Sequence, residues 1–380
     1  MNIRFLSLNQ SSDNLNNEII EAFAAVIERG NFILGEEVSL FEKEWADFCH
    51  AAGAVGVGNG TDAITLALIA SGAVQKNEIN EVITTPLSAG YTSLAILNAG
   101  ATPVFVDIDE NTLNLNPARI ESAITPHTRA IIPVHLYGQK ANMPEIYKIA
   151  RRHNLFVIED AAQAHGVSFA ESLNEADRFI ATFSFYPTKN LGAMGDGGAI
   201  ISNDPDFLRT VRALRQGGHF EALQGYLIGK NSRLDEIHAA LLRVKLKKLR
   251  EWNTRRSELA GIYFDRLKNS HRVKLTAVKN ASNHAFHLFV IRHPERDKLR
   301  NFLFGNGVET LIHYPFLLHQ QNLFRSSPQK VAPVAERIVK EILSLPLYPQ
   351  MTNDEVEQIC RLISEFENEH SSALSHDANR

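Results

Sequence analysis

The chain has 380 residues, of which 44% are hydrophobic and 22% charged, a composition typical of a globular protein with one large and one smaller domain. Its formal net charge of -4 gives no electrostatic basis for binding nucleic acid or an anionic membrane. The two cysteines, Cys49 and Cys360, suit neither a disulfide framework nor a metal site, and no apolar run is long enough for a membrane span or a signal peptide. We therefore expect a cytoplasmic protein.

The first two thirds of the chain alternates short apolar runs with helical patterns. Strands are predicted over residues 54–57, 82–85, 103–107, 130–135, 155–159, 180–185 and 199–201. Helices are predicted over residues 61–71, in the segment that ends near residue 99, and over residues 143–153. Continuous apolar strands that alternate with helices indicate a mostly parallel sheet covered on both faces, which is an α/β fold.

The pattern changes near residue 233. A long amphipathic helix is predicted over residues 233–251, followed by a strand over 286–291 and a helix over 353–366. These elements are typical of a smaller α+β domain. The expected organisation is a large α/β domain over residues 1–250, with its N-terminal segment packing towards the second domain, a small α+β domain over residues 251–368, and a polar, flexible tail over residues 369–380.

The helix predicted at residues 61–71 begins in the glycine-rich run GVGNGTDA, residues 56–63. Glycines let backbone amides approach an anion, the helix N-terminus adds partial positive charge, and the Thr61 hydroxyl can donate, so the run indicates a phosphate site. It also fits a tight turn in which Thr61 or Asp62 caps the helix. The spacing resembles a dinucleotide fingerprint as well, but lacks the acidic residue expected at the end of a second strand.

A second candidate follows the strand at residues 155–159, in the run DAAQAHG, residues 160–166. Asp160 stands at the carboxyl end of a strand, where open α/β sheets bind ligands, and its carboxylate could keep a ring nitrogen protonated. Glu159 or Asp160 could equally cap a helix. His165 is interpreted as a structural histidine or, with Asp160, as part of a metal site for which no further ligands appear at useful spacing.

The third candidate is Lys189, in the run FSFYPTKNLG, residues 183–192. The Tyr-Pro pair ends an apolar strand because proline cannot donate to the ladder. A lysine delivered at such a strand end loses its proton more easily when water is excluded, and a neutral amine is what Schiff-base chemistry needs. A solvated surface lysine is the alternative. Ser184, in the same run, could donate to a phosphate.

A fourth signal opens the long helix. The run GKNSRLD, residues 229–235, offers Asn231 and backbone amides to an anion, or simply caps the helix through Ser232. A phosphate site, a strand-end aspartate and a strand-end lysine, in that order on an α/β sheet, together match a pyridoxal-phosphate (PLP) site, in which lysine holds the cofactor and aspartate pairs with its ring nitrogen.

At these residues the chain resembles the DegT/StrS-type nucleotide-sugar aminotransferases, which are PLP enzymes of fold type I, and is most like those acting on dTDP-keto-deoxysugars. The resemblance extends from about residue 32 to about residue 349. It is carried by residues 58–63, 103–107, 133–139, 159–166, 184–192, 195–198, 231–235, 312–315 and 343–347. The chain departs from the family after Pro86, where Tyr91 does not align with the aromatic residue that usually stacks on the cofactor ring.

The resemblance implies a role for each matching residue. Lys189 and Asp160 would be catalytic, Lys189 as the lysine that bonds the cofactor and Asp160 as the partner of its ring nitrogen. Further cofactor contacts are implied for Gly60, Thr61, Asp62, Gln163, Ser184 and, from the partner subunit of a homodimer, Asn231. Contacts with the sugar are implied for Tyr186, His313 and Tyr314. No metal is expected.

The reaction that the resemblance implies is amino transfer from an amino acid, with glutamate the expected donor, to a dTDP-linked 3-keto or 4-keto deoxyhexose in amino-sugar biosynthesis. Three alternatives are considered. A PLP-dependent sugar dehydratase of the same family would have histidine in place of Lys189. A nicotinamide-dependent dehydrogenase would rest on the glycine-rich turn alone. A non-catalytic sensor could bind PLP or the sugar without turnover.

Overall fold

The computed structural model describes the chain except for residues 1, 9–12, 219–227, 279–282, 325–331 and 378–380. Its central layer consists of two four-stranded sheets with the strand orders β3-β2-β4-β5 and β1-β8-β7-β6. The strands are β1 (Gly53–Val57), β2 (Glu81–Thr84), β3 (Thr102–Phe105), β4 (Thr128–Ile131), β5 (Phe156–Val157), β6 (Glu159–Asp160), β7 (Ile180–Ser184) and β8 (Gly198–Ser202).

The two sheets continue into each other. β5 and β6 are pieces of one extended segment, and between them the amide of Ile158 donates to the carbonyl of Ile131 at 3.1 Å. Every strand pair is parallel except those of β8, which runs antiparallel to β1 and β7. The prediction of a mostly parallel α/β sheet is therefore confirmed, with one reversed strand.

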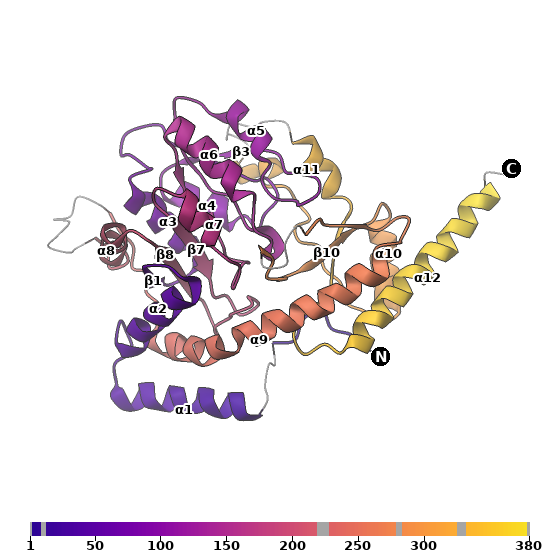
Figure 1. The fold of residues 1–380 in the computed structure, drawn as a ribbon, viewed down its shortest axis with the longest axis horizontal. Helices are drawn as coiled ribbons and strands as arrows, with labels where there is room; N and C mark the ends of the chain where they lie inside the picture. The colour runs from indigo at the N-terminus through magenta and orange to yellow at the C-terminus, as the bar shows by residue number, and fades with distance from the viewer. Residues whose placement is uncertain (1, 9–12, 219–227, 279–282, 325–331, 378–380) are drawn as a thin grey trace.

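Helices cover both faces of this layer (Figure 1), which explains why the strands are apolar throughout. On β8, Ala199 and Ile201 pack with α2 and α9, whereas Ile200 faces the core that α3 and α8 complete. The helices of this part are α1 (Asp13–Arg29), α2 (Glu36–Cys49), α3 (Gly60–Ser71), α4 (Tyr91–Asn98), α5 (Pro117–Ile120), α6 (Met143–His153), α7 (Ala170–Glu175) and α8 (Pro205–Leu214), with short 3-10 turns η1 (Glu121–Ala123) and η2 (Leu136–Gly138).

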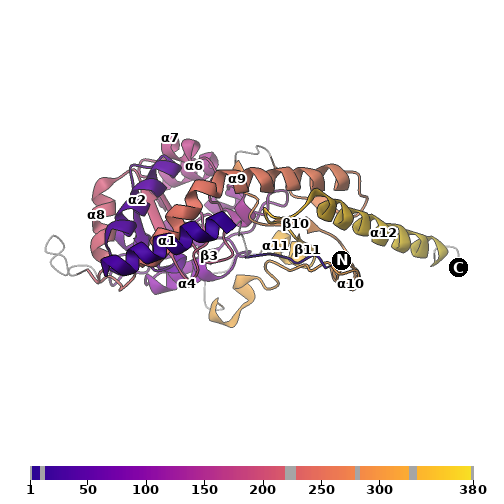
Figure 2. The same ribbon diagram turned by 90° about the horizontal axis from the view of Figure 1, so that it is seen from below.

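The helix α9 (Glu236–Leu267) crosses between the two parts of the chain, as Figures 1 and 2 show. Leu241 and Leu249, in its first half, pack in the core beneath β7 and β8. Leu259 and Tyr263, in its second half, pack in a separate C-terminal core. The helix is longer than the predicted 233–251, because its buried stripe continues beyond residue 251 and packs in this different core.

The C-terminal part is built around an antiparallel sheet in the order β11-β10-β9. Its elements are β9 (Lys274–Leu275), β10 (Phe289–Arg292), α10 (Arg296–Gly305), η4 (Leu318–Gln320), η5 (Asn322–Phe324), α11 (Pro333–Ile338), β11 (Ile342–Leu345) and α12 (Asn353–Asp377). The N-terminal segment joins this part, since Ile3 forms a parallel bridge with Val308. None of the helices in the described ranges combines the length and apolar character that crossing a bilayer requires.

Three boundaries differ from the predictions. β4 ends at Ile131 rather than at residue 135. β10 begins at Phe289, because the residues before it bond the 137–138 turn instead of the sheet: the amide of Leu288 donates to the carbonyl of Tyr137 at 3.2 Å. The helix α12 continues to Asp377, where a flexible tail was expected from residue 369, and its end extends beyond the rest of the chain in Figure 2.

Candidate active site

Lys189 lies on a tight turn that follows β7. The turn is closed by backbone hydrogen bonds from the Lys189 amide to the carbonyl of Tyr186 at 2.9 Å and from the Ala193 amide to the carbonyl of Phe185 at 2.7 Å. Gly192 is required here, since a Cβ atom at this position would lie 2.4 Å from the carbonyl oxygen of Pro187. The strand end and the proline thus present the lysine where the sequence predicts it.

The environment of Lys189 favours the neutral amine. Burial lowers the pKa of Lys189 to about 8, while the negative charge of Asp160 acts in the opposite direction. Burial first, and the positive charge of Lys189 second, also lower the pKa of His165 to about 3 and that of His313 to about 4. These neighbouring imidazoles are neutral near pH 7, so that Asp160 is the charge that balances Lys189.

Asp160 is held in a fixed orientation. It is buried at the end of β6, where its Oδ2 accepts a 2.6 Å hydrogen bond from the hydroxyl of Thr92 and its Oδ1 accepts from the amide of Ala162 at 3.1 Å. Thr92 belongs to the first turn of α4. These two donors leave lone pairs on the carboxylate that can accept a further proton-bearing group.

Glu159, the residue before Asp160, serves a different purpose. Its carboxylate is also fully buried, but it accepts hydrogen bonds from His135 at 2.7 Å and Tyr147 at 2.8 Å. The burial of this group acts to raise the pKa of Glu159, yet the hydrogen bond from His135 and nearby positive charge hold it below its ordinary value. Neighbouring residues of a strand point to opposite faces, so only Asp160 faces Lys189.

Gln163 connects the sheet end to the C-terminal part. Its Oε1 accepts from the amide of Tyr137 at 2.6 Å, and its Nε2 donates to the hydroxyl of Tyr314 at 2.9 Å. Burial is the main reason that the pKa of Tyr314 is raised to about 12. The hydroxyl of Tyr137 donates to the carbonyl of His313. The predicted residues Gln163, His313 and Tyr314 therefore form one cluster.

The residues predicted to bind a phosphate lie at the start of α3. A Cβ atom on Gly60 would lie 2.7 Å from the Cβ of Ser184, so the two predicted residues are in direct backbone contact and only glycine fits. Asn59 caps the helix through a 2.8 Å hydrogen bond from the Asp62 amide. Thr61, in the first turn, stands at the positive end of the helix macrodipole.

The side chains of three other predicted residues pair elsewhere or are exposed. The carboxylate of Asp62 pairs with Lys230 at 2.8 Å and accepts from Asn59 at 3.2 Å, so it points to these partners. Asn231 is exposed and bridges to Gln216. Tyr186 is exposed on the Lys189 turn, with its carbonyl accepting from the Lys189 amide.

The sequence analysis missed four side chains of this site. Thr92 bonds Asp160, and its position soon after a central strand was an available signal. His287 is buried, and its ring Nδ1 donates to Asn190 Oδ1 at 3.2 Å. Asn190 also donates to Asn253 on α9 at 2.9 Å. His287 and Asn253 are distant in sequence, and no local pattern marks them.

These residues fit a cofactor with an aldehyde, a ring nitrogen and a phosphate. Lys189 offers a low-pKa amine, Asp160 an oriented carboxylate, and Gly60 begins a helix whose N-terminus favours an anion. In the part of the chain that the structure describes, no three His, Cys, Asp or Glu side chains gather as they would to hold a metal ion. The fold and site are those of a PLP-dependent enzyme of fold type I.

Comparison with known proteins then identifies the family. The chain belongs to the DegT/DnrJ/EryC1/StrS aminotransferase family, whose sequence profile matches residues 13–364. The nicotinamide-dependent dehydrogenase that the glycine-rich turn allowed is accordingly set aside. The chain is an aminotransferase, and its cofactor is PLP.

Three similar proteins span almost the whole chain. A "Pleiotropic regulatory protein" of Geobacillus stearothermophilus is 42% identical, over 96% of this chain and 99% of its own length. The "dTDP-3-amino-3,6-dideoxy-alpha-D-galactopyranose transaminase" of Aneurinibacillus thermoaerophilus is 41% identical, over 96% and 99%. The crystal structure of NtdA from Bacillus subtilis, with bound cofactor PMP (pyridoxamine phosphate), superposes with a TM-score of 0.87 at 30% identity, over 96% of this chain and 85% of that chain.

Proposed function

We propose that this protein transfers an amino group from L-glutamate to the keto group of a dTDP-linked deoxyhexose, with a 3-keto sugar favoured over a 4-keto sugar. The observation that carries the proposal is the Lys189 amine, whose pKa is lowered to about 8 beside an oriented Asp160. The choice of sugar rests on the similarity to the Aneurinibacillus transaminase. The product would serve amino-sugar biosynthesis.

Bound PLP supplies an aldehyde that condenses with amines and a ring that accepts the electron pair released at a substrate carbon. Lys189 Nζ would hold the aldehyde carbon at rest. Once displaced by the donor's amine, the neutral Nζ is the base that takes a proton from the donor's α-carbon and later returns one to the sugar carbon. Asp160, fixed by Thr92, would keep the ring nitrogen protonated, and Gln163 would contact the ring hydroxyl.

The remaining residues would bind and orient. Gly60, Thr61, Asp62 and Ser184 would form the phosphate site at the start of α3, with Asp62 acting through its pairing to Lys230 rather than through direct contact. Tyr314, His313 and the exposed Tyr186 would contact the sugar. Because the pKa of His313 is lowered to about 4, this histidine would act as a neutral hydrogen-bonding group.

We further propose a homodimer in which Asn231 reaches the phosphate of the partner's site. Exposed apolar residues gather on the segments that border the start of α9, as a subunit interface would require: Phe32, Ile33, Met194 and Ile228. Ile33 bridges to Asp235, immediately before that helix.

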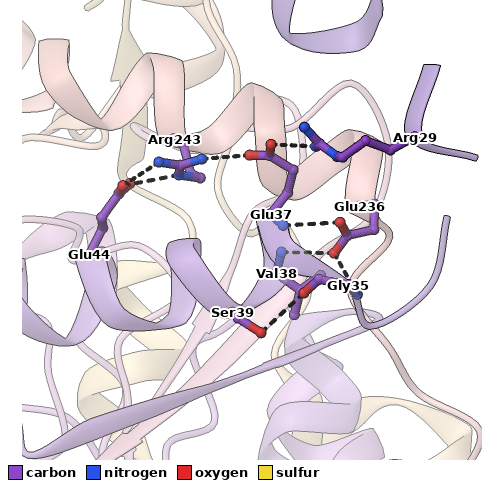
Figure 3. Close-up of polar contacts among 8 residues, drawn as sticks. All are labelled: Arg29, Gly35, Glu37, Val38, Ser39, Glu44, Glu236 and Arg243. Atoms are coloured by element: carbon purple, nitrogen blue, oxygen red, sulfur yellow. Dashed lines mark hydrogen bonds and ion pairs between the residues drawn. The ribbon is translucent and has the colours of Figure 1, made fainter. Parts of the chain in front are cut away.

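A buried network fixes this border (Figure 3). The carboxylate of Glu236 accepts from the amides of Gly35 at 2.9 Å, Glu37 at 3.0 Å and Val38 at 2.8 Å, which caps α2 from the first residue of α9. Glu37 in turn pairs with Arg29 and Arg243. The segment that carries Phe32 and Ile33 is thereby held beside the segment that carries Asn231.

The reaction is tested by its two halves. Incubation of the PLP-loaded protein with glutamate should convert the cofactor to pyridoxamine phosphate, measured by absorbance and mass spectrometry. The aminated protein should then convert one member of a panel of dTDP- and UDP-linked 3-keto and 4-keto sugars. Lys189→Ala should lose both halves by at least about a thousandfold, since it removes the base and the covalent holder. Unchanged activity in that variant would refute the proposal.

The same assay separates the remaining alternatives. A sugar dehydratase would release a deoxygenated sugar without consuming glutamate's amino group. A non-catalytic sensor, a role that the name of the Geobacillus relative brings to mind, would bind PLP but form no pyridoxamine phosphate with glutamate. Lys189 next to Asp160 supports the transaminase over both, because neither rival needs a low-pKa lysine beside an acid.

The shared site is tested with mixed subunits. Lys189→Ala and Asn231→Ala are each expected to be inactive or weak alone. If Asn231 acts across the interface, a hybrid dimer of the two variants contains one site with both residues intact, and mixing should restore activity towards a quarter of the wild-type value on random exchange. Failure of mixing to restore any activity, with exchange verified by mass spectrometry, would contradict the shared site.

A further inference from the structure

The helix α9 carries a second buried lysine, which the mechanism above does not use. The side chain of Lys245 is 8% exposed, and its Nζ donates to the carbonyl oxygen of Gly192 at 2.8 Å. Burial lowers the pKa of Lys245 to about 8, and in the described ranges no carboxylate pairs with it. A buried ammonium without an acidic partner is costly, so a specific contact is expected to account for its presence.

The acceptor of this hydrogen bond closes the Lys189 turn. Gly192 stands three residues after Lys189 and is packed so tightly against Pro187 that no side chain fits. The carbonyl of Gly192 points to α9, and the next residue, Ala193, bonds back to Phe185 at 2.7 Å. The hydrogen bond from Lys245 to the Gly192 carbonyl therefore restrains the position of the whole turn.

A second side chain of α9, that of Asn253, contacts the middle of the same turn. Asn253 accepts from the side-chain amide of Asn190, the residue after Lys189, at 2.9 Å. The same Asn190 amide donates to the carbonyl of Ala285 at 2.8 Å. Asn253 also donates to the carbonyl of His165 at 2.7 Å. Lys245 and Asn253 are eight residues apart on the helix, about 12 Å along its axis. They therefore hydrogen-bond the turn at two separate points.

We propose that Lys245 is a positioning residue for Lys189, whose hydrogen bond to the Gly192 carbonyl fixes the turn so that the Lys189 amine is held beside Asp160. The inference rests on the proposed function, because it assumes that Lys189 bonds the cofactor. Lys245 itself touches neither cofactor nor substrate. Its role is to limit the freedom of the turn that presents the reactive amine.

This role has a consequence that a purely structural role would not have. Lys189 Nζ condenses with the aldehyde of PLP, forming a carbon–nitrogen double bond and releasing one water. Pyridoxamine phosphate has an amine in place of the aldehyde and cannot form that bond, although it uses the same phosphate site and the same ring contacts. Loosening the turn should therefore weaken the binding of PLP and spare the binding of pyridoxamine phosphate.

The test uses Lys245→Met, which keeps the length and apolar stem of the side chain but removes the donor. The matched control is Lys247→Met, an exposed lysine two residues further along α9. Dissociation constants for PLP and for pyridoxamine phosphate are measured on the full chain by absorbance and calorimetry. We expect Lys245→Met to weaken PLP binding roughly tenfold or more, to leave pyridoxamine phosphate within about twofold, and Lys247→Met to change neither.

Two results would overturn the inference: unchanged PLP binding in Lys245→Met, or equal weakening of both ligands, which is what general damage to the fold would give. Should Lys245→Met fail to fold, Asn253→Ala removes the second hydrogen bond between α9 and the turn. That variant must then weaken PLP binding and leave pyridoxamine phosphate binding unchanged. A wild-type protein that forms no bond between Lys189 and PLP would overturn the proposed function itself, a failure that the wild-type titration alone reveals.

Discussion

The turn after β7 and the middle of α9 each contain a lysine whose pKa burial lowers to about 8, yet the two amines face different partners. Lys189 stands beside the carboxylate of Asp160, whose charge opposes the effect of burial. Lys245 donates to the backbone carbonyl of Gly192. A low pKa thus marks a desolvated amine, and the neighbouring groups decide whether that amine is placed for chemistry or for holding the backbone.

Among the variants that test the difference between the two lysines, Asp160→Asn should have the largest effect on turnover. The amide keeps a side chain of the same shape that Thr92 can bond, but removes the charge, so we expect turnover to fall by roughly a hundredfold or more. Because Asp160 raises the pKa of Lys189, the variant should also lower that pKa below about 8. Steady-state kinetics measure the loss of turnover, and the pH dependence of PLP attachment to the apoprotein measures the pKa of the Lys189 amine.

The pH dependence of PLP attachment next distinguishes a desolvated lysine from an ordinary solvated one. The neutral amine attacks the aldehyde, and for a pKa of about 8 its fraction falls to about 1% at pH 6. The rate at which the apoprotein bonds PLP should rise about fiftyfold from pH 6 to pH 8 and level off above that. Stopped-flow absorbance measures this rate. A profile that keeps rising to pH 10 would mean an ordinary solvated lysine.

A smaller effect is expected from Gly60→Ala, and it sharpens the contrast with Lys245→Met. The new Cβ would press on Ser184 at 2.7 Å and distort the phosphate site, so PLP and pyridoxamine phosphate should both bind about tenfold more weakly. Gly261→Ala is the control, since a Cβ there meets nothing within 4 Å. Weakening confined to PLP would contradict a phosphate role for Gly60.

Local patterns in the sequence were sufficient to predict the sheet and the chain order of its site residues. The Tyr-Pro strand end located Lys189, and the glycine run located the start of α3 that meets Ser184. They favoured Asp160 as the partner of a ring nitrogen and left either acid as a helix cap, but they gave no sign that Glu159 pairs with His135, which only its direction in space decides. Local patterns could not predict contacts between segments that are distant in sequence. Examples are the contacts of Asn253 and Lys245 with the Lys189 turn.

The length of α9 illustrates the same limit. Its periodic apolar pattern ended near residue 251 in the prediction, whereas the helix continues to Leu267 because its second half packs on a different core. Lys245 and Tyr263 are 18 residues apart, about five full turns, so they lie on the same side of the helix, and one buried stripe meets both cores.

The central claim is that Lys189, and not Lys245, is the lysine that bonds PLP. Borohydride reduction of the PLP-loaded protein converts the carbon–nitrogen double bond to a stable amine, and peptide mass spectrometry then locates the added mass. The account predicts that this mass is found on Lys189, with the peptide that carries Lys245 unmodified. Attachment to Lys245 or to any other lysine, or no attachment at all, would contradict it.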